Sequence, residues 1–117
     1  MVTVLHHSVL VVNKTKILGL LGLARRAGKV VSGADAVKEA YMKKKLKLVI
    51  LSEDASERTK SNFYNLIDRQ FVNICEFSTM DELGHIIGKT PKAVIGIKDI
   101  NFAKEIIKNI NGGDVIG

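Results

Sequence analysis

Two nearly unbroken apolar runs constrain the fold more than any other feature of the sequence. LKLVIL covers residues 46–51 and KAVIGIK covers residues 92–98. A strand with one face in water alternates apolar and polar residues, whereas a strand covered on both faces stays apolar throughout. We therefore expect both runs to be buried strands of a sheet that carries other elements on its faces.

Helical and strand-like segments alternate along the rest of the chain. In the first helical segment, apolar residues recur at the spacing of one helix face, which Leu18 and Leu23 widen. The alternation predicts an α/β sandwich in which a central sheet has helices on both sides. Predicted helices cover residues 13–27, 34–45, 54–70, 79–87 and 102–110, and predicted strands cover residues 29–31, 46–51, 72–77 and 92–98.

One domain is the natural expectation for 117 residues, of which 46% are hydrophobic. We assign it to residues 13–111. Residues 1–12 lack the basic residues and the cleavage site of a signal peptide, so we predict none there. We predict a floppy or strand-like N-terminal appendage, with an extension upstream of the core as the alternative. Residues 112–117 are predicted to be a flexible tail. No run reaches about 18 apolar residues, so no membrane span is expected.

The charge balance favours an anionic partner. The chain carries 18 Lys and Arg residues against 12 Asp and Glu residues, a formal net charge of +6. Nucleic acid is the first candidate for such a surplus, although ordinary solubilising charge explains it equally well. Aromatic residues make up only 5% of the chain, which disfavours extensive base stacking and favours recognition of backbone and shape.

Cysteine and histidine are too scarce for a metal site. Cys75 is the only cysteine, so no internal disulfide or cysteine-based zinc site can form. It is predicted to be a buried core thiol, which fits a reducing, cytoplasmic compartment. His6 and His7 would point to opposite faces of a strand, and His85 stands alone. We predict no metal and no cofactor.

Acidic pairs occur at residues 53–54 and 81–82, each at or near a predicted helix start. Carboxylates at such positions favour the helix dipole and cap free N–H groups. Thr79 and Glu82 also have the spacing of a capping box. This structural account is sufficient, so we predict no catalytic residues and no enzyme activity.

Basic side chains gather near the junction between the first two predicted helices. Ser32-Gly33 leads directly into the helix predicted from Ala34, which leaves backbone N–H groups free to face an anion. Cations at helix ends also favour the dipole, so a purely structural role stays open. The basic residues concerned are Arg25, Arg26, Lys29, Lys38 and Lys43, together with Lys89 and Lys92 in a later loop.

The order of these residues resembles that of a known family, the kink-turn-binding ribosomal proteins that include archaeal L7Ae and eukaryotic L30e. The resemblance is strongest to a bacterial YlxQ-like subgroup and covers most of the chain, from about residue 16 to residue 110. It is carried by LLGLARRAGKVVSGADAVKEA, LKLVILSEDAS, the ELG of residues 82–84, and GKTPKAVIGIKD.

The resemblance implies a three-layer α/β/α sandwich with a central, mostly four-stranded mixed sheet. It also implies RNA binding without catalysis or cofactor, through the loop and helix start at Gly33 and a second loop at residues 88–92. The basic residues noted above and these two loops together give the predicted RNA-binding residues: Arg25, Arg26, Lys29, Ser32, Gly33, Ala34, Asp35, Lys38, Lys43, Gly88, Lys89, Thr90 and Lys92.

Several positions depart from the family pattern of Gly-x-Asn-Glu followed three residues later by Lys. Asp35 stands in place of the asparagine, Ala36 in place of the glutamate, and Glu39 in place of the lysine. A further family lysine corresponds to Met80. Ala36 offers no hydrogen bond to a base edge, and Asp35 lacks amide donors. Contacts to the RNA backbone and shape are therefore expected to dominate.

The sequence thus predicts a non-catalytic, monomeric, cytoplasmic RNA-binding protein, ribosomal or ribosome-associated. Its predicted partner is structured RNA, with ribosomal RNA and the ribosome as candidates. The alternative is a protein-interaction or assembly factor of the same fold that has lost high-affinity kink-turn binding.

Overall fold

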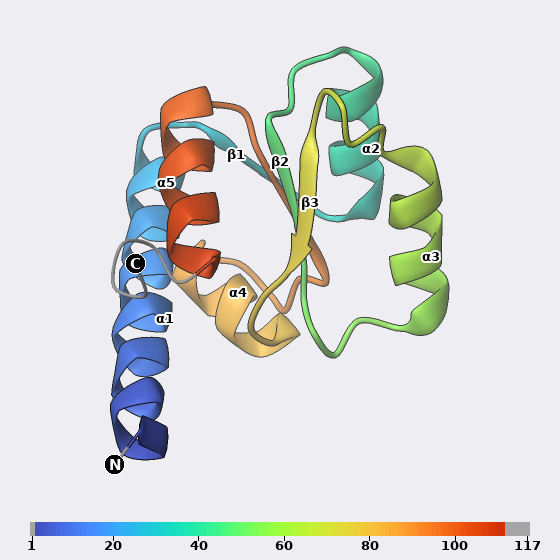
Figure 1. The fold of residues 1–117 in the computed structure, drawn as a ribbon. Coiled ribbons are helices and arrows are strands. Elements are labelled where there is room, and N and C mark those ends of the chain that lie inside the picture. The colour runs from blue at the N-terminus through green and yellow to red at the C-terminus, as the bar shows by residue number, and fades with distance from the viewer. Residues whose placement is uncertain (1, 112–117) are drawn as a thin grey trace.

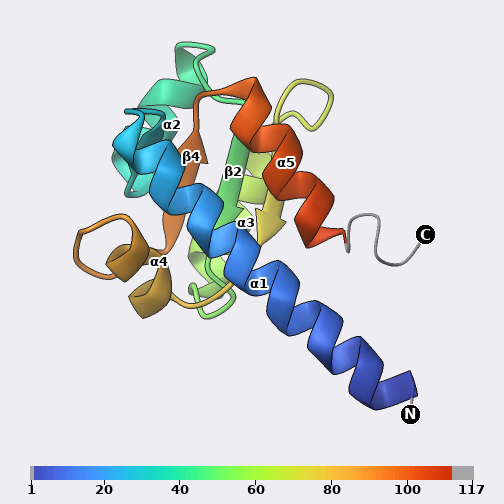
Figure 2. The same ribbon diagram turned by 90° about the vertical axis from the view of Figure 1, so that its left-hand side faces the viewer.

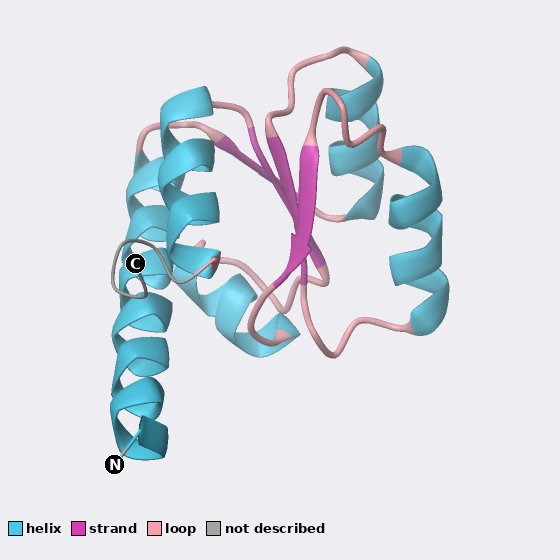
Figure 3. Ribbon diagram, in the orientation of Figure 1, coloured by secondary structure: helices cyan, strands magenta, loops and turns pink. Residues whose placement is uncertain are grey.

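The computed structural model describes residues 2–111, with side chains from residue 13 onward. Five helices and four strands alternate along this part of the chain (Figures 1 and 3). In chain order they are α1 (Val2–Arg26), β1 (Val30–Ser32), α2 (Ala34–Met42), β2 (Leu48–Leu51), α3 (Glu57–Leu66), β3 (Asn73–Glu76), α4 (Met80–Ile86), β4 (Val94–Ile97) and α5 (Ile100–Ile110).

The four strands form one mixed sheet in the order β1-β4-β2-β3. Strand β4 runs antiparallel to both β1 and β2, and β2 runs parallel to β3. All four residues of β2 and all four residues of β4 are buried, which confirms the prediction from their nearly unbroken apolar runs. These two strands occupy the middle of the sheet.

Helices cover both faces of the sheet, which confirms the three-layer α/β/α sandwich. Helices α1, α4 and α5 lie on one side, and α2 and α3 lie on the other (Figure 1). The core divides in the same way, because successive side chains of a strand point to opposite faces. Leu48 and Ile50 pack with Ile17 and Leu21 of α1, whereas Val49 and Leu51 pack with the helices of the other layer.

Helix α1 begins at Val2, so the prediction of a floppy or strand-like segment at residues 1–12 was wrong for the backbone of residues 2–12. No glycine or proline interrupts the chain between Val2 and Leu18, so nothing there ends a helix. Figures 1 and 2 show the N-terminal part of α1 extending beyond the body of the molecule. The division between appendage and domain stays a prediction, and residues 112–117 lie outside the described residues.

Other elements also differ from the prediction, and α3 is shorter at both ends. Helix α1 buries the predicted face, but Leu23 is exposed, because it lies about 200° around the helix from Leu21. Helix α3 begins only after Ser56, whose side chain accepts a hydrogen bond from the N–H of Thr59 (3.1 Å). It ends at Leu66, short of the predicted residue 70.

Strand β3 is an edge strand, and its side chains are half-buried or exposed. Cys75 is therefore partly buried against the α1-side core rather than fully enclosed, and this burial raises the pKa of its thiol to about 12. Glu76 ties the strand to α3, since its carboxylate accepts from the Tyr64 hydroxyl (2.8 Å) and pairs with the Lys60 ammonium (3.0 Å).

Candidate nucleic-acid interface

The start of α2 leaves backbone N–H groups uncapped by any side chain. Gly33 is the N-cap residue, with φ +91° and ψ 148°, and no side chain accepts a hydrogen bond there. The first helical bond runs from the N–H of Val37 to the carbonyl of Gly33 (3.0 Å). The structure thus has the uncapped helix start that Ser32-Gly33 predicts, and such a start attracts anions.

Gly33 combines an unusual backbone conformation with open space. Side chains rarely adopt its positive φ, yet a Cβ built at this position would meet no heavy atom within 4 Å. Its N–H donates to the carbonyl of Val94 (2.9 Å), which attaches the junction to the beginning of β4. Glycine is therefore needed here for the backbone, and the space in front of it is free for a ligand.

A second loop, residues 88–92, leads into β4 at the same end of the sheet. It is anchored to α4, because the N–H of Lys89 donates to Gly84 (2.8 Å) and the N–H of Lys92 donates to Met80 (3.0 Å). A Cβ at Gly84 would lie 2.3 Å from the carbonyl oxygen of Thr90, so the loop packs directly on the helix. Residues 89 and 90 at its tip are exposed.

Arg25 of α1 joins this loop. A Cβ built on Gly88, whose φ is +71°, would lie 2.6 Å from the Arg25 guanidinium, so that group rests on the glycine. Arg26 folds back toward Gly22, beside Ile86 of α4. Both arginines are exposed, and Arg25 places a positive charge against the loop.

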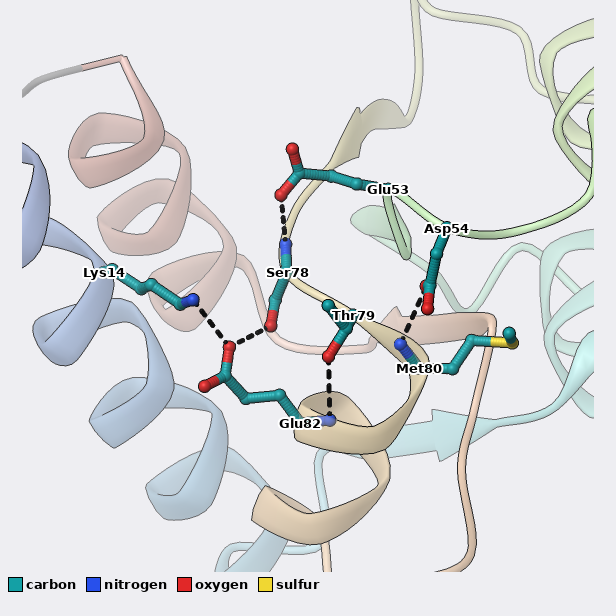
Figure 4. A network of polar contacts seen from close by, with 7 residues as sticks. All are labelled: Lys14, Glu53, Asp54, Ser78, Thr79, Met80 and Glu82. Atoms are coloured by element: carbon teal, nitrogen blue, oxygen red, sulfur yellow. Dashed lines mark hydrogen bonds and ion pairs between the residues drawn. The ribbon is translucent and has the colours of Figure 1, made fainter.

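The acidic pairs hold α4 in position (Figure 4). Glu53 accepts from the N–H of Ser78 (2.9 Å), and Asp54 accepts from the N–H of Met80 (2.9 Å). Residues 53–54 thus bind free N–H groups, but at the start of α4 and not at the start of the helix that follows them, which Ser56 caps, so the prediction that this pair caps its own helix was wrong. Because α4 anchors residues 88–92, this network also sets the position of the loop.

The predicted capping box forms only in part. Thr79 accepts from the N–H of Glu82 (3.2 Å). The Glu82 carboxylate does not return to Thr79 but accepts from the Ser78 hydroxyl and pairs with Lys14 of α1 (2.9 Å; Figure 4). The hydrogen bond from Ser78 and then that from Lys14 lower the pKa of Glu82. The network thus links α4 to α1 as well.

Most of the predicted site residues meet at one end of the sheet, and we call this set the junction surface. Lys38 lies one turn into α2 and, with Ala34 and Asp35, lines a groove whose other wall is formed by Asn62 and Asn65 of α3. The junction surface consists of Arg25, Arg26, Ser32, Gly33, Ala34, Asp35, Lys38, Gly88, Lys89, Thr90 and Lys92.

Two predicted residues, Lys29 and Lys43, lie away from the junction surface, and their contact with RNA stays a prediction. Lys29 precedes β1 and Gly33 follows it, which separates them by about 13 Å of extended chain. Lys43 follows the last turn of α2, where its ammonium pairs with Glu39 (2.7 Å). The hydrogen bond from Lys43 lowers the pKa of Glu39.

A cluster of lysines at the opposite end of the sheet was missed by the sequence reasoning. Lys47 precedes β2 and Lys98 follows β4, and the pairing of Leu48 with Ile97 sets them side by side. The register of two central strands was the signal that could have revealed this. The cluster lines a shallow depression and is called here the lysine depression: Lys29, Lys44, Lys45, Lys47 and Lys98.

Within residues 13–111, no three His, Cys, Asp or Glu side chains are grouped so that they could hold a metal ion. Helix α1 is the longest helix of the described chain, but neither it nor any other described helix is long and apolar enough to cross a membrane.

Comparison with known proteins finds one family profile and two named relatives that cover most of the chain. The profile of the ribosomal protein L7Ae/L30e/S12e/Gadd45 family matches residues 15–107. A relative from Enterococcus faecium named RNA-binding protein YlxQ is 36% identical over 100 residues, which cover 86% of this chain and 96% of the relative. A Bacillus subtilis relative of the same name is 39% identical over 88 residues, covering 75% and 88% of the two chains.

Two solved structures have a similar fold. A Bacillus halodurans protein of unknown function is 34% identical and superposes with a TM-score of 0.78, over 82% of this chain and 97% of the other. The Giardia lamblia 15.5kD RNA binding protein shares the fold at 15% identity, with a TM-score of 0.70 over 90% of each chain. The family profile and the two relatives span most of the sequence, so the chain belongs to the ribosomal protein L7Ae/L30e/S12e/Gadd45 family.

Proposed function

We propose that this protein binds structured RNA through the junction surface, as a non-catalytic member of its family. The observation that carries the proposal is the uncapped start of α2 beside an exposed loop that bears Lys89 and Lys92. Relatives at 36% and 39% identity are named RNA-binding proteins, which supports the same conclusion.

The contacts would be made mainly to phosphates. Backbone N–H groups at the first turn of α2 are donors that suit a phosphate oxygen, and the helix dipole favours negative charge there. Arg25 and the loop lysines add positive charge beside these N–H groups. Ala36 has no polar side-chain atom to offer a base, so specificity would come from the shape of the RNA rather than from base edges at this position.

We further propose that the protein acts in the cytoplasm as a monomer and needs no cofactor. Its role would be ribosomal or ribosome-associated. The family to which the chain belongs supports a ribosomal RNA partner.

A second candidate function is a protein-interaction or assembly factor. The Asp35 carboxylate at the first turn of α2 favours it, because this charge already answers the helix dipole and repels an incoming phosphate. Stable recovery of a protein partner after nuclease treatment, together with no measurable RNA affinity, would favour this second function.

The test is the salt dependence of binding to a labelled kink-turn hairpin, followed by fluorescence anisotropy. Each lost phosphate contact lowers the steepness of log affinity against log salt by about 1, so Lys89→Ala combined with Lys92→Ala should lower it by about 2. Lys104→Ala, on the exposed side of α5, is the control for the loss of one positive charge elsewhere on the surface. Wild-type affinity and slope in the double variant would refute the proposed site.

A further inference from the structure

The lysine depression concentrates positive charge, although Lys45 also attracts the nearby Glu39 carboxylate. Lys98 and Lys29 are joined through their backbones, since the N–H of Lys98 donates to the carbonyl of Lys29 (2.9 Å). Lys47 is held beside them by its own N–H, which donates to Ile97 (2.8 Å). Among residues 13–111, the ion pairs involve other lysines and none of the five in the depression.

Such a cluster is unfavourable without an anion. Like charges that converge on one surface repel one another, and the repulsion is relieved when a polyanion supplies the opposite charge. The five lysines come from separate segments, namely the turn before β1, the turn after α2, and the ends of β2 and β4. Solvation of the end of α2 explains the exposure of Lys44 and Lys45 but does not explain why all five lysines converge.

The backbone at Lys44 adds an independent observation. Its φ is +59°, in the left-handed region where glycine is the usual residue after a helix. Its N–H donates to the carbonyl of Tyr41, and the N–H of Lys45 donates to the carbonyl of Ala40, each at 2.9 Å. These bonds are common at helix ends, but lysine is an unusual residue at the left-handed position. A residue that tolerates this conformation poorly is often retained for its side chain.

An apolar groove adjoins the depression and shares two of its lysines. Lys44 and Lys47 line both, and the groove also contains Tyr41, Met42 and Phe71. The Phe71 side chain is 76% exposed, and Met42 is 65% exposed. All six aromatic residues of the chain lie in the described part, and Phe71 is the exposed one.

We propose that the lysine depression and Phe71 form a second RNA surface, which binds a single-stranded segment at the end of the sheet opposite the junction surface. The lysines would contact successive phosphates, and one unstacked base would lie on the Phe71 ring. A basic groove beside an exposed aromatic ring is the arrangement by which proteins hold single strands without reading sequence. The positive rim of the groove favours this occupant over an apolar protein segment. The inference rests on the proposed function, because it assigns a second contact to an RNA-binding protein.

The test uses fluorescein-labelled oligouridine of about 20 nucleotides, which exceeds the ~4–16 nucleotides that single-stranded modules cover. Lys44→Gly should weaken binding and lower the salt slope by about 0.7, the value for one contact to a single strand. Phe71→Ala should weaken binding about fivefold or more while leaving the slope unchanged, because stacking releases no counterions. Lys104→Ala should match the wild type.

The outcomes separate this inference from the proposed function. Lys44→Gly suits the native turn, so loss of affinity in a variant that melts no lower than the wild type cannot come from misfolding. Wild-type affinity for oligouridine in both variants would overturn the second surface, as would binding of the hairpin but not of oligouridine by the wild type. If the wild type bound neither RNA, both proposals would fall.

Discussion

Replacing Gly33 by alanine isolates the energetic role of the backbone at the junction. The added methyl group meets no heavy atom within 4 Å, so steric overlap contributes nothing. The cost comes from forcing an alanine into φ +91° and ψ 148°, a region close to one that only glycine populates. A residue held in such a region costs on the order of 1–3 kcal/mol, and we expect about 2 kcal/mol of lost stability.

Gly19→Ala is the matched control, because it makes the same chemical change with the opposite expected sign. Gly19 lies in the interior of α1 on an exposed face, where a Cβ also meets nothing within 4 Å. Alanine is preferred over glycine in a helix by about 0.5–1 kcal/mol.

Thermal unfolding followed by circular dichroism measures both effects. With an unfolding entropy of about 2 cal/mol/K per residue over roughly 100 ordered residues, 2 kcal/mol corresponds to about 10 °C. Gly33→Ala should therefore lower the Tm by about 10 °C, and Gly19→Ala should raise it by about 2–5 °C. An unchanged Tm for Gly33→Ala, or shifts of the same sign in both variants, would refute the reasoning.

Three further predictions concern other parts of the fold. Lys44→Gly should stabilise the protein by up to about 1 kcal/mol in denaturant unfolding. The left-handed conformation costs a lysine about 1–2 kcal/mol, and the larger conformational entropy of glycine in the unfolded chain offsets part of this gain. A loss of stability would contradict this prediction. Ser78 and Lys14 lower the pKa of Glu82 below its ordinary 4.5, so this carboxylate contributes stability that is present above pH 4.5 and is lost as the pH falls through its folded value. Glu82→Gln should therefore weaken the pH dependence of unfolding below pH 4.5, and an acid limb identical to that of the wild type would show that the interaction is absent. Burial raises the pKa of Cys75 to about 12, so at pH 8 the native thiol should react with a disulfide reagent far more slowly than the unfolded one, and equal rates would rule out that burial.

The two central strands could be predicted from the sequence because burial on both faces requires apolar residues throughout a strand. Strands β2 and β4 are continuous apolar segments, because a strand that is covered on both faces must place apolar side chains on both. Element ends were less predictable, since they depend on individual contacts. Helix α3 starts where Ser56 caps it, and α1 continues to Val2 because nothing in the sequence stops it.

The candidate site shows the same division. The helix start at Gly33 could be predicted because Ser32, Gly33 and Ala34 are adjacent in sequence. Lys47 and Lys98 are far apart in sequence, and only the strand register joins them. Conversely, Lys29 is near Gly33 in sequence, but the extended strand between them places the two residues at opposite ends of the sheet.

The most direct test of the central claim is an NMR titration of the isotope-labelled protein with the kink-turn hairpin. If the start of α2 binds RNA phosphate, the amide signals of residues 34–36 and 88–92 should show the largest shifts, and those of residues 34–36 should move as expected for new hydrogen bonds. RNA binding that leaves these amides unmoved, with the largest shifts elsewhere, would contradict the account.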